Sequence, residues 1–450
     1  MMTKQKALLL ALSLTVASAG LAACGSNNNN AASGGNAAAN ATANASAGNA
    51  ENGGGNAAAA ETEAEPAGPA KPGELTIWAD DKAQLPVIQG FAEKYAEKTG
   101  IKVNVTPMAM NDQPDALALD GPAGKGPDLF YQPGIGNLVV KGLVQPIKAE
   151  QPVLDTFTPE SLQALSQDGQ LYGLPAVTET YALFYNKKLL PEPPKTIADL
   201  EKIAAEKTNA KKQEYGFLFE GTNFYFAWAF LGGSGGYIFK PTDSGGYDIH
   251  DNGLNKEGTV KGAKLIQSWF DKGYLPKGVN SDIVGGLFGQ GKAAAVISGP
   301  WAVMDFKKQL GEDVGVTALP TLEGDAHPTS FIGVKGWMLS KFSKHPEWAS
   351  DLAAFITSGE NALEYFKQTG EVPPVKSVLN NELLTGDPIV AGFSQQIQYG
   401  MPFPTVPELD HVWDPMANAL KLISEGGDVQ KSLGDAVVQI EDKMKMAGAK

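Results

Sequence analysis

Arginine is absent from this sequence, so the 36 residues counted as Lys or Arg are all lysines. Arginine carries the planar guanidinium that holds carboxylates and phosphates through two parallel hydrogen bonds. Its absence therefore favours a neutral ligand over an anionic one. The formal net charge is −14, and so acidic a chain presents no positive field to nucleic acid or to an anionic membrane surface. We expect no nucleic-acid partner.

Cysteine occurs once, at Cys24, so no internal disulfide can form. The residues before it have the pattern of an export signal, with an apolar run over 7–17 that is shorter than a transmembrane helix requires. The tetrapeptide Leu21-Ala22-Ala23-Cys24 resembles the lipobox of bacterial lipoproteins. The resemblance implies a signal peptide over 1–23 and acylation of Cys24. The lipid would be the only membrane attachment, on the extracytoplasmic face of the cell membrane, which is the extracellular side in a Gram-positive bacterium.

Several enzyme motifs are also missing. The sequence has no GxSxG, no HExxH and no zinc-spaced set of cysteines and histidines, and its histidines are scattered at His250, His327, His345 and His411. A glycoside hydrolase would need two carboxylates about 5–10 Å apart across the scissile bond. Glu179 and Asp81 are candidates, but nothing in the sequence pairs them. We expect a protein that is not an enzyme and has no catalytic residue, cofactor or metal site.

Residues 24–72 combine the candidate lipid site with a segment of Asn, Ala, Gly and Ser, as in Asn52-Gly53-Gly54-Gly55. This segment lacks the apolar side chains that would offset the entropy of ordering it. We therefore expect a disordered linker that ends where the body begins, at Gly73.

The body opens with a β-α-β pattern. Residues 73–79 read as a strand, apolar residues recur at helical spacing over 85–95, Thr99-Gly100 supplies a stop, and 101–105 alternate as a second strand. Such units favour a parallel sheet whose ligands bind at the carboxyl ends of the strands. Asp81 and Lys82 follow the first strand directly and are therefore candidate ligand contacts.

Two apolar runs, over 171–177 and 181–185, are separated by the polar triplet Thr178-Glu179-Thr180. Both runs contain β-formers, so the pattern predicts one long extended segment with a polar interruption. A carboxylate between two apolar arms is costly to bury unless it is paired, and at a cleft it would anchor a ligand. A glutamate at a strand end facing water is the alternative reading of Glu179.

Other segments carry local signals. Thr196-Ile197-Ala198-Asp199 predicts a helix with a capping box, and 293–297 predict a buried strand. The glycine-rich run 232–237 lacks the spacing of a phosphate-binding loop, so we expect a turn. Trp337 is interpreted equally well as a core residue or as part of a cleft rim.

The run from Tyr172 to Thr180, continued by Leu183-Phe184-Tyr185-Asn186, resembles the hinge segment of bacterial maltose/maltodextrin-binding proteins, the sugar-binding subunits of ABC importers. Further blocks of the same resemblance occur in order over Glu74–Lys450, at Gly126-Pro127-Asp128, Ser298-Gly299-Pro300-Trp301, 331–335, 400–407 and Trp413. The resemblance implies an α/β, two-lobed periplasmic-binding-protein fold of type II. Its hinge of crossing segments would lie near 177–182, near 331–334 and near Asp387. The N-terminal lobe would comprise 73–177 plus 333–386, and the C-terminal lobe 178–332 plus 387–450.

The resemblance also implies a sugar site, in which Glu179 contacts the sugar while Trp301 and Trp413 stack on it. Flat rings suit the apolar C–H faces of a sugar, and hydrogen-bonding groups suit its hydroxyl rim. The complete set of expected ligand-binding residues is Asp81, Lys82, Tyr131, Glu179, Tyr225, Trp301, Met401 and Trp413. One departure concerns the loop in which the family's best-known members have a Trp, an Asp and an Arg. The matching positions here are Tyr131, which would replace the aromatic residue, and Gln132-Pro133-Gly134, which lack the charged contacts to sugar hydroxyls.

These patterns together predict the substrate-binding lipoprotein of an ABC importer. It would capture maltose or a maltodextrin between two closing lobes and deliver it to a membrane permease, and we expect it to act as a monomer. Because the loop after Tyr131 departs from the family, a different oligosaccharide such as a galactoside stays open as the ligand. The remaining alternatives are a glycoside hydrolase and an adhesin or purely structural surface lipoprotein.

Overall fold

A computed structural model of the protein describes residues 69–242 and 246–448. The expected signal peptide, Cys24 and all but the last residues of the expected linker lie outside the described residues. The first described residues lie against helix α11 (Pro346–Ile356), where Trp348 Nε1 donates to the carbonyl oxygens of Pro69 at 3.3 Å and Ala70 at 3.1 Å. Within these described ranges, no helix is both long enough and apolar enough to cross a bilayer.

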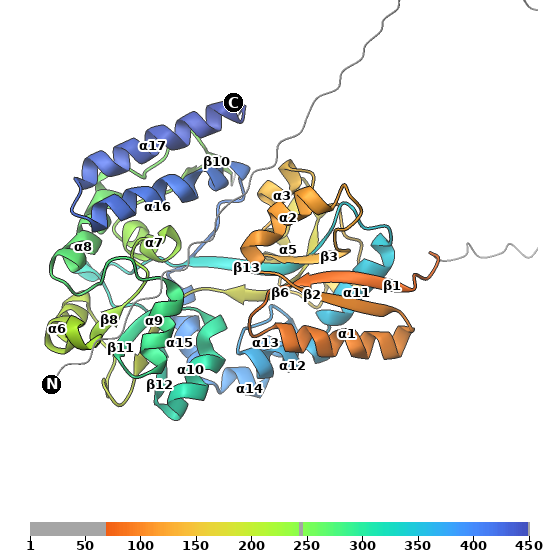
Figure 1. Ribbon diagram of the computed structural model, residues 1–450, viewed down its shortest axis with the longest axis horizontal. Helices are drawn as coiled ribbons and strands as arrows, with labels where there is room; N and C mark the ends of the chain where they lie inside the picture. The colour runs from red at the N-terminus through yellow and green to blue at the C-terminus, as the bar shows by residue number, and fades with distance from the viewer. Residues whose placement is uncertain (1–68, 243–245, 449–450) are drawn as a thin grey trace, which may run out of the picture. The chain divides into compact units, whose positions relative to one another are not determined.

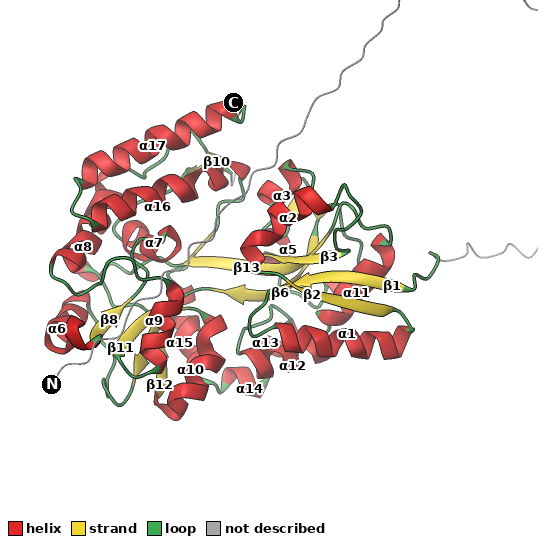
Figure 2. Ribbon diagram, in the orientation of Figure 1, coloured by secondary structure: helices red, strands yellow, loops and turns green. Residues whose placement is uncertain are grey.

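The body is a mixed α/β structure with two main sheets (Figures 1 and 2). The first sheet has the order β14-β13-β3-β1-β2, and β6 also pairs with β13. Its strands are β1 (Glu74–Ala79), β2 (Lys102–Pro107), β3 (Leu129–Gln132), β6 (Gly173–Glu179), β13 (Phe331–Leu339) and β14 (Met401–Pro402). Strand β1 is parallel to β2 and β3, whereas β13 is antiparallel to β3 and β6.

The second sheet has the order β12-β7-β11-β8. Its strands are β7 (Ala182–Asn186), β8 (Tyr215–Leu218), β11 (Ala293–Ser298) and β12 (Val314–Thr317). Strand β7 is antiparallel to both of its neighbours, and β11 is parallel to β8. Two further pairs are short hairpins: β4 (Ser166–Gln167) with β5 (Gln170–Leu171), and β9 (Lys240–Pro241) with β10 (Tyr247–Asp248).

Helices pack on both sheets, for example α1 on β2 and α11 on β13 and β6. The helices whose side chains join the cores of the first sheet, or that connect its strands, are α1 (Leu85–Thr99), α2 (Gln113–Asp120), α3 (Gly136–Val140), α4 (Gln151–Leu154), α5 (Pro159–Ala164), α11, α12 (Gly359–Thr369), α13 (Lys376–Leu379) and α14 (Glu382–Thr385). Those grouped with the second sheet are α6 (Ile197–Lys207), α7 (Phe224–Gly233), α8 (Glu257–Asp271), α9 (Ser281–Gly289), α10 (Val303–Leu310), α15 (Pro388–Ile397), α16 (Asp410–Ser424) and α17 (Val429–Met446).

The predicted β-α-β opening is confirmed. Helix α1 starts at Leu85, with proline in its first turn, and buries one face that includes Phe91 and Tyr95. It ends at Gly100, whose φ of 71° is the left-handed conformation that glycine adopts without strain, and whose N–H donates to the Ala96 carbonyl at 2.7 Å. The chain then returns as β2, parallel to β1.

The extended segment around Glu179 is also present, and its two arms belong to different sheets: β6 pairs with β13, whereas β7 pairs with β11 and β12. The interruption is displaced from its predicted position, because Glu179 is the last residue of β6 and the break falls at Thr180 and Tyr181. The buried Thr180 hydroxyl lies 2.7 Å from the Ser330 hydroxyl and 2.9 Å from the Phe331 carbonyl oxygen, which ties this break to the start of β13.

Buried apolar side chains form three clusters. The largest draws on residues 181–331 and 389–444, and the other two draw on residues 75–177 and 334–384. Along the chain, membership changes from one core to another within 177–181, 331–334 and 384–389. Figure 1 shows β13 and β6 running side by side where the chain passes between these cores.

The predicted capping box is confirmed, since Thr196 Oγ1 accepts from the Asp199 N–H at 3.1 Å and Asp199 Oδ2 accepts from the Thr196 N–H at 2.9 Å. The buried strand over 293–297 is confirmed as β11. The turn predicted from residue 232 is wrong at its start, because α7 continues through Gly233. A Cβ at Gly233 would lie 2.7 Å from the His327 carbonyl oxygen, so this glycine allows close packing of a helix. Trp337 is a core residue with 1% exposure.

Candidate functional site

The pairing of β6 with β13 brings Glu179 and Lys335 onto one face of the strand pair. Glu179 is directly opposite Gly333, and Lys335 lies two residues farther along β13. Such diagonal neighbours are within reach of long side chains. Because Gly333 has no side chain, the Glu179 carboxylate extends past it, and its Oε2 lies 2.5 Å from Lys335 Nζ. The register shifts by one residue just beyond Lys335, at Gly336, and such bulges re-aim side chains.

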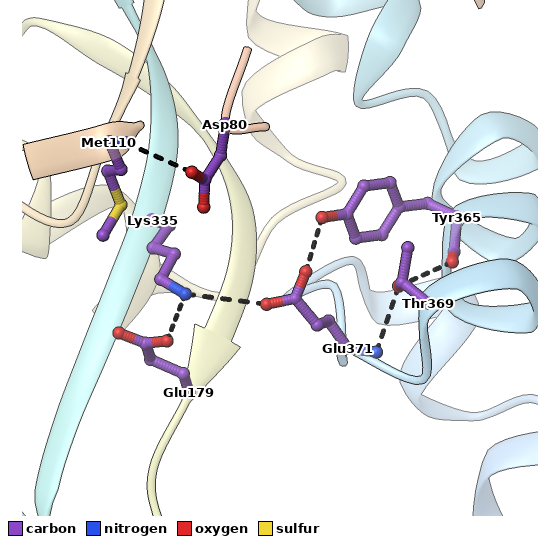
Figure 3. A network of polar contacts seen from close by, with 7 residues as sticks. All are labelled: Asp80, Met110, Glu179, Lys335, Tyr365, Thr369 and Glu371. Atoms are coloured by element: carbon purple, nitrogen blue, oxygen red, sulfur yellow. Dashed lines mark hydrogen bonds and ion pairs between the residues drawn. The ribbon is translucent and has the colours of Figure 1, made fainter. Parts of the chain in front are cut away.

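A second carboxylate approaches Lys335 from another element. Glu371 follows α12 after Gly370, which has φ 74°, and its Oε1 lies 3.6 Å from Lys335 Nζ (Figure 3). The Tyr365 hydroxyl donates to Glu371 Oε2 at 2.6 Å, and the Glu371 N–H donates to Thr369 Oγ1 at 3.1 Å. These two hydrogen bonds, to Tyr365 and Thr369 near the end of α12, thus orient Glu371 toward Lys335. The side chains of Glu179, Lys335 and Glu371 are each 9% exposed or less.

Asp80 adds a third acid at the end of β1. Its Oδ1 accepts from the N–H groups of Met110 at 3.2 Å and Asp81 at 3.1 Å. Burial raises its pKa, while the positive charges of Lys82 and Lys335 act in the opposite direction. Asp80 thus belongs to the same electrostatic environment as Lys335.

The charge states of this cluster follow from burial and pairing. Burial raises the pKa of Glu179, and the neighbouring Lys335 ammonium opposes that shift. Burial alone would lower the pKa of Lys335, but Glu179 and Glu371 outweigh it and raise the pKa above its usual value. Lys335 therefore stays charged at neutral pH, as a buried cation among three acids: Asp80, Glu179 and Glu371.

Aromatic rings lie beside this charged cluster. Trp301 lies in the short 3-10 helix η3 (Pro300–Ala302), and Lys335 Nζ is 5.1 Å from its ring centroid, a cation–π distance. Tyr225, in the first turn of α7, has its ring centroid 6.4 Å from that of Trp301. Burial raises the pKa of Tyr225, and the charge of Glu179 raises it further. Trp301 and Tyr225 thus both approach the Glu179–Lys335 pair.

A second group of rings continues from Tyr225. Phe403 is stacked on Phe331 at 4.5 Å and 16°, and its centroid lies 6.2 Å from Tyr225 and 6.0 Å from Trp413. A Cβ placed on Gly333 would lie 3.1 Å from Phe403 and 3.2 Å from Glu179, so Phe403 and Glu179 flank the same glycine. Phe403 therefore connects the carboxylate to Trp413.

Four of the eight expected ligand contacts are thus brought together: Glu179, Tyr225, Trp301 and Trp413. Met401, in β14, lies next to them, and its sulfur accepts a hydrogen bond from Trp228 Nε1 at 3.2 Å. Trp228 in turn stacks on Phe331 at 5.5 Å.

The other three lie at the first sheet. Tyr131 is in β3, 1% exposed and 5.2 Å from Trp337. Burial raises its pKa well above the usual value, and Glu371 and Glu179 add to the shift, so its hydroxyl is close to the acids. Asp81 and Lys82 are exposed after β1, and both are linked to Asp80: the Asp81 N–H donates to its carboxylate, and the Lys82 charge acts on its pKa.

Sequence reasoning missed Asp80, Lys335, Glu371 and Phe403. Lys335 and Phe403 belong to blocks that carried the family resemblance, at 331–335 and 400–407, and a lysine within an apolar strand was a usable signal. Asp80 directly precedes Asp81 and Lys82, which were predicted as ligand contacts. Glu371 had no comparable signal.

Two sheets of mixed α/β topology, three chain segments that pass between their cores, and a carboxylate-and-ring site at the crossing strands define the solute-binding proteins of the periplasmic type. The protein belongs to the bacterial extracellular solute-binding protein family, whose pattern matches residues 90–392. The predicted fold class is therefore confirmed. Members of this family bind solutes for transport and are not enzymes, which sets the hydrolase alternative aside.

Relatives with assigned ligands cover most of this chain. The galactooligosaccharide-binding protein of Bacillus subtilis (strain 168) is 36% identical over 385 residues, spanning 84% of this chain and 90% of that protein. A maltooligosaccharide ABC transporter solute-binding lipoprotein of Streptococcus pneumoniae (strain ATCC BAA-255 / R6) is 30% identical over 391 residues, spanning 84% and 90%. Among solved structures, a cyclo/maltodextrin-binding protein complexed with maltotetraose is 40% identical. It superposes with a TM-score of 0.71 and covers 84% of this chain and 98% of that one.

Proposed function

We propose that this protein captures maltose or a longer malto-oligosaccharide outside the cell and delivers it to the permease of an ABC importer. The observation that carries the proposal is the convergence of one buried carboxylate, Glu179, with the rings of Tyr225, Trp301 and Trp413. Rings cover the C–H faces of glucose units, and a carboxylate accepts hydrogen bonds from their hydroxyls. The 40% identity to a structure that holds maltotetraose supports a glucan as the ligand.

The same proposal includes two closing lobes, one of residues 73–177 plus 333–386 and the other of 178–332 plus 387–450. The distribution of the buried clusters supports this division, since core membership changes close to each boundary. Ligand binding shifts the population toward the closed form because the closed form offers more contacts. The closed form then docks on the permease.

Attachment through a lipid on Cys24, at the extracytoplasmic face, completes the proposal. The lipobox-like tetrapeptide supports it, and so does the streptococcal relative, which is itself a lipoprotein of an ABC transporter. We expect Cys24→Ser to release the protein into the medium or to leave its signal peptide uncut. A Cys24→Ser protein that stays processed and membrane-bound would rule the anchor out. Sedimentation of the purified protein tests the expected monomer.

A galacto-oligosaccharide is the second candidate ligand. It is favoured by the 36% identity to the galactooligosaccharide-binding protein of Bacillus subtilis. The fold, the transport role and the crossing-strand site are common to both candidates, so the choice depends on the ring geometry and the hydroxyl contacts of the sugar.

Isothermal titration calorimetry distinguishes the candidates. We would titrate the purified protein with maltose, maltotriose, maltotetraose, a cyclodextrin and a β-galacto-oligosaccharide, and recover each sugar afterwards. Micromolar or tighter binding of an α-glucan, recovered intact, supports the proposal. Binding of the galactoside alone would identify a galacto-oligosaccharide as the ligand. Cleavage of any sugar would support the alternative that the protein is a glycoside hydrolase.

Truncation of the rings tests the site itself. Trp301→Ala and Trp413→Ala should each weaken sugar binding by about 1–3 kcal/mol through lost stacking and burial. Trp348→Ala is a matched control, because that indole bonds to Pro69 and Ala70 and packs against the core of residues 75–177 and 334–384, and none of the contacts described for Glu179, Tyr225, Trp301 and Trp413 involves it. Affinities within twofold of the parent for both site variants would remove these rings from the site.

A further inference from the structure

Lys335 is a buried cation whose partners come from three separate elements. Glu179 ends β6, Glu371 follows α12, and Trp301 lies in η3, and each approaches the same ammonium (Figure 3 shows the two acids). Two of these partners, Glu179 and Trp301, are proposed sugar contacts. Lys335 itself has only 9% of its side chain exposed.

A stabilising role alone does not account for this arrangement. Removing an ammonium and a carboxylate from water costs several kcal/mol per ion, and a buried pair often does no better than a hydrophobic pair of the same volume. Here three acids, Asp80, Glu179 and Glu371, act on Lys335, and the further lysine near them, Lys82, is exposed and acts on Asp80. The arrangement is better suited to orienting groups than to holding the fold together.

The ammonium acts on both of the sugar-binding groups that it touches. A buried carboxylate without a counter-charge takes up a proton, after which one of its oxygens becomes a donor. Lys335 opposes that change in Glu179. The ion pair engages Glu179 Oε2, and among the described residues no hydrogen-bond donor to Oε1 is found, so Oε1 can accept from a ligand hydroxyl.

The ring contact has a related effect. A cation near an aromatic face holds that ring by electrostatic attraction, worth about 0.5–2 kcal/mol depending on desolvation. Glu179 and Glu371 hold the Lys335 ammonium in place through two ion pairs. The ammonium in turn restricts the position of the Trp301 indole.

We propose that Lys335 is a positioning residue for sugar binding, which keeps Glu179 as an ionised acceptor and fixes the Trp301 ring, while Glu371 fixes Lys335. This inference rests on the proposed function. It assigns Lys335 and Glu371 no contact with the ligand. It predicts that both residues determine affinity through the groups that they hold.

Lys335→Met tests the proposal, because methionine keeps much of the length of lysine and removes the charge. We expect it to weaken binding of the preferred sugar at least tenfold. Lys272→Met is the matched control: Lys272 pairs with Glu201 at 3.1 Å and lies 5.6 Å from the Tyr274 ring centroid, so it loses the same kinds of contact outside the site and should leave affinity unchanged.

The pH dependence of binding separates positioning from mere support of the fold. The titratable groups that face Lys335 are Asp80, Glu179, Glu371 and the phenols of Tyr131 and Tyr365. The phenols stay neutral below pH 8 because burial raises their pKa. Without the ammonium, Glu179 should protonate at a higher pH, so the affinity of Lys335→Met should fall at a higher pH than that of wild type when the pH is lowered. Carboxyl-carbon NMR of the sugar-free proteins should show the same upward shift of the Glu179 titration.

The outcomes decide between the proposals. If wild type binds no oligosaccharide, the proposed function fails, and this inference fails with it. If wild type binds and Lys335→Met binds equally well, or loses affinity with a pH profile parallel to that of wild type, only the positioning role is overturned. Should Lys335→Met not fold, Glu371→Gln decides, since glutamine retains an acceptor for Tyr365. We expect Glu371→Gln to weaken binding about threefold to tenfold, and an unchanged affinity would refute the proposal.

Discussion

Gly333→Ala is the most direct test of the geometry at the crossing strands. Gly333 lies opposite Glu179 in the β6–β13 pair, and a Cβ there would lie 3.1 Å from Phe403 Cε2 and 3.2 Å from Glu179 Cγ and Oε1. The φ of Gly333 is not in the positive range, so alanine brings no backbone strain at this position. The perturbation is confined to the two side chains that flank the new methyl group.

The size of the effect follows from these distances. Carbon atoms pack best at about 3.5–4.0 Å, so Phe403 and Glu179 must each retreat by roughly half an ångström. Phe403 is stacked 4.5 Å from Phe331, and Glu179 is paired with Lys335, so neither moves freely. Overpacking of this kind typically costs about 1–3 kcal/mol. The smaller conformational freedom of alanine in the unfolded chain offsets about 0.4–1 kcal/mol of the loss in stability.

We therefore expect Gly333→Ala to bind its sugar about tenfold more weakly, about 1.4 kcal/mol, while unfolding within a few degrees of wild type. Calorimetric titration and thermal denaturation measure the two quantities on the same samples. Gly90→Ala is the control, because nothing lies within 4 Å of a Cβ at that position in α1. Wild-type affinity in Gly333→Ala would refute the inference that Glu179 contacts the ligand from the position described.

Two further predictions concern stability. Thr196→Ala removes the acceptor of the Asp199 N–H and should lower the free energy of unfolding by about 1 kcal/mol in urea titrations, whereas Thr196→Ser should retain it; equal losses for both would contradict the capping role. Asp80→Asn should raise the melting temperature near pH 7, and the gain should shrink as the pH falls toward about 4. Burial raises the Asp80 pKa above its usual 3.8. The ionised Asp80 carboxylate therefore destabilises the folded state at high pH, and this effect disappears once the carboxylate is protonated at low pH. A gain that is the same at every pH would show that ionisation of Asp80 is not its source.

Much of the fold was predictable because its signals are local. The opening strand, α1 and β2 follow from periodicity and from a glycine stop at Gly100, and the α6 cap follows from Thr196 and Asp199. The error at Gly233 has a tertiary cause. A side chain there would collide with the His327 carbonyl oxygen, which lies far away in the sequence, so no local pattern reveals why the helix contains this glycine.

The site was predictable to a lesser extent, and the family resemblance contributed most of it. Periodicity alone placed Glu179 between two apolar arms but left open whether it faces water, and the structure places it in a buried ion pair. Tyr131 illustrates the converse. It was expected as a ligand contact because it matches the position of an aromatic residue in the resembling family, and in the structure its ring is buried in β3 against Trp337.

Lys335 shows why the polar half of the site escapes sequence reasoning. A lysine between Val334 and the apolar end of β13 must have a buried counter-charge, and that much can be inferred from the strand pattern. The identity of the counter-charge cannot, because the chain has 50 acidic residues and the two that meet Lys335 lie in other elements. Glu179 is selected by the register of β6 against β13, and Glu371 by the turn after α12, which Gly370 permits. Register and turn become known only when the strands are paired, so the partners of a buried charge are among the last features of a binding site that a single sequence can reveal.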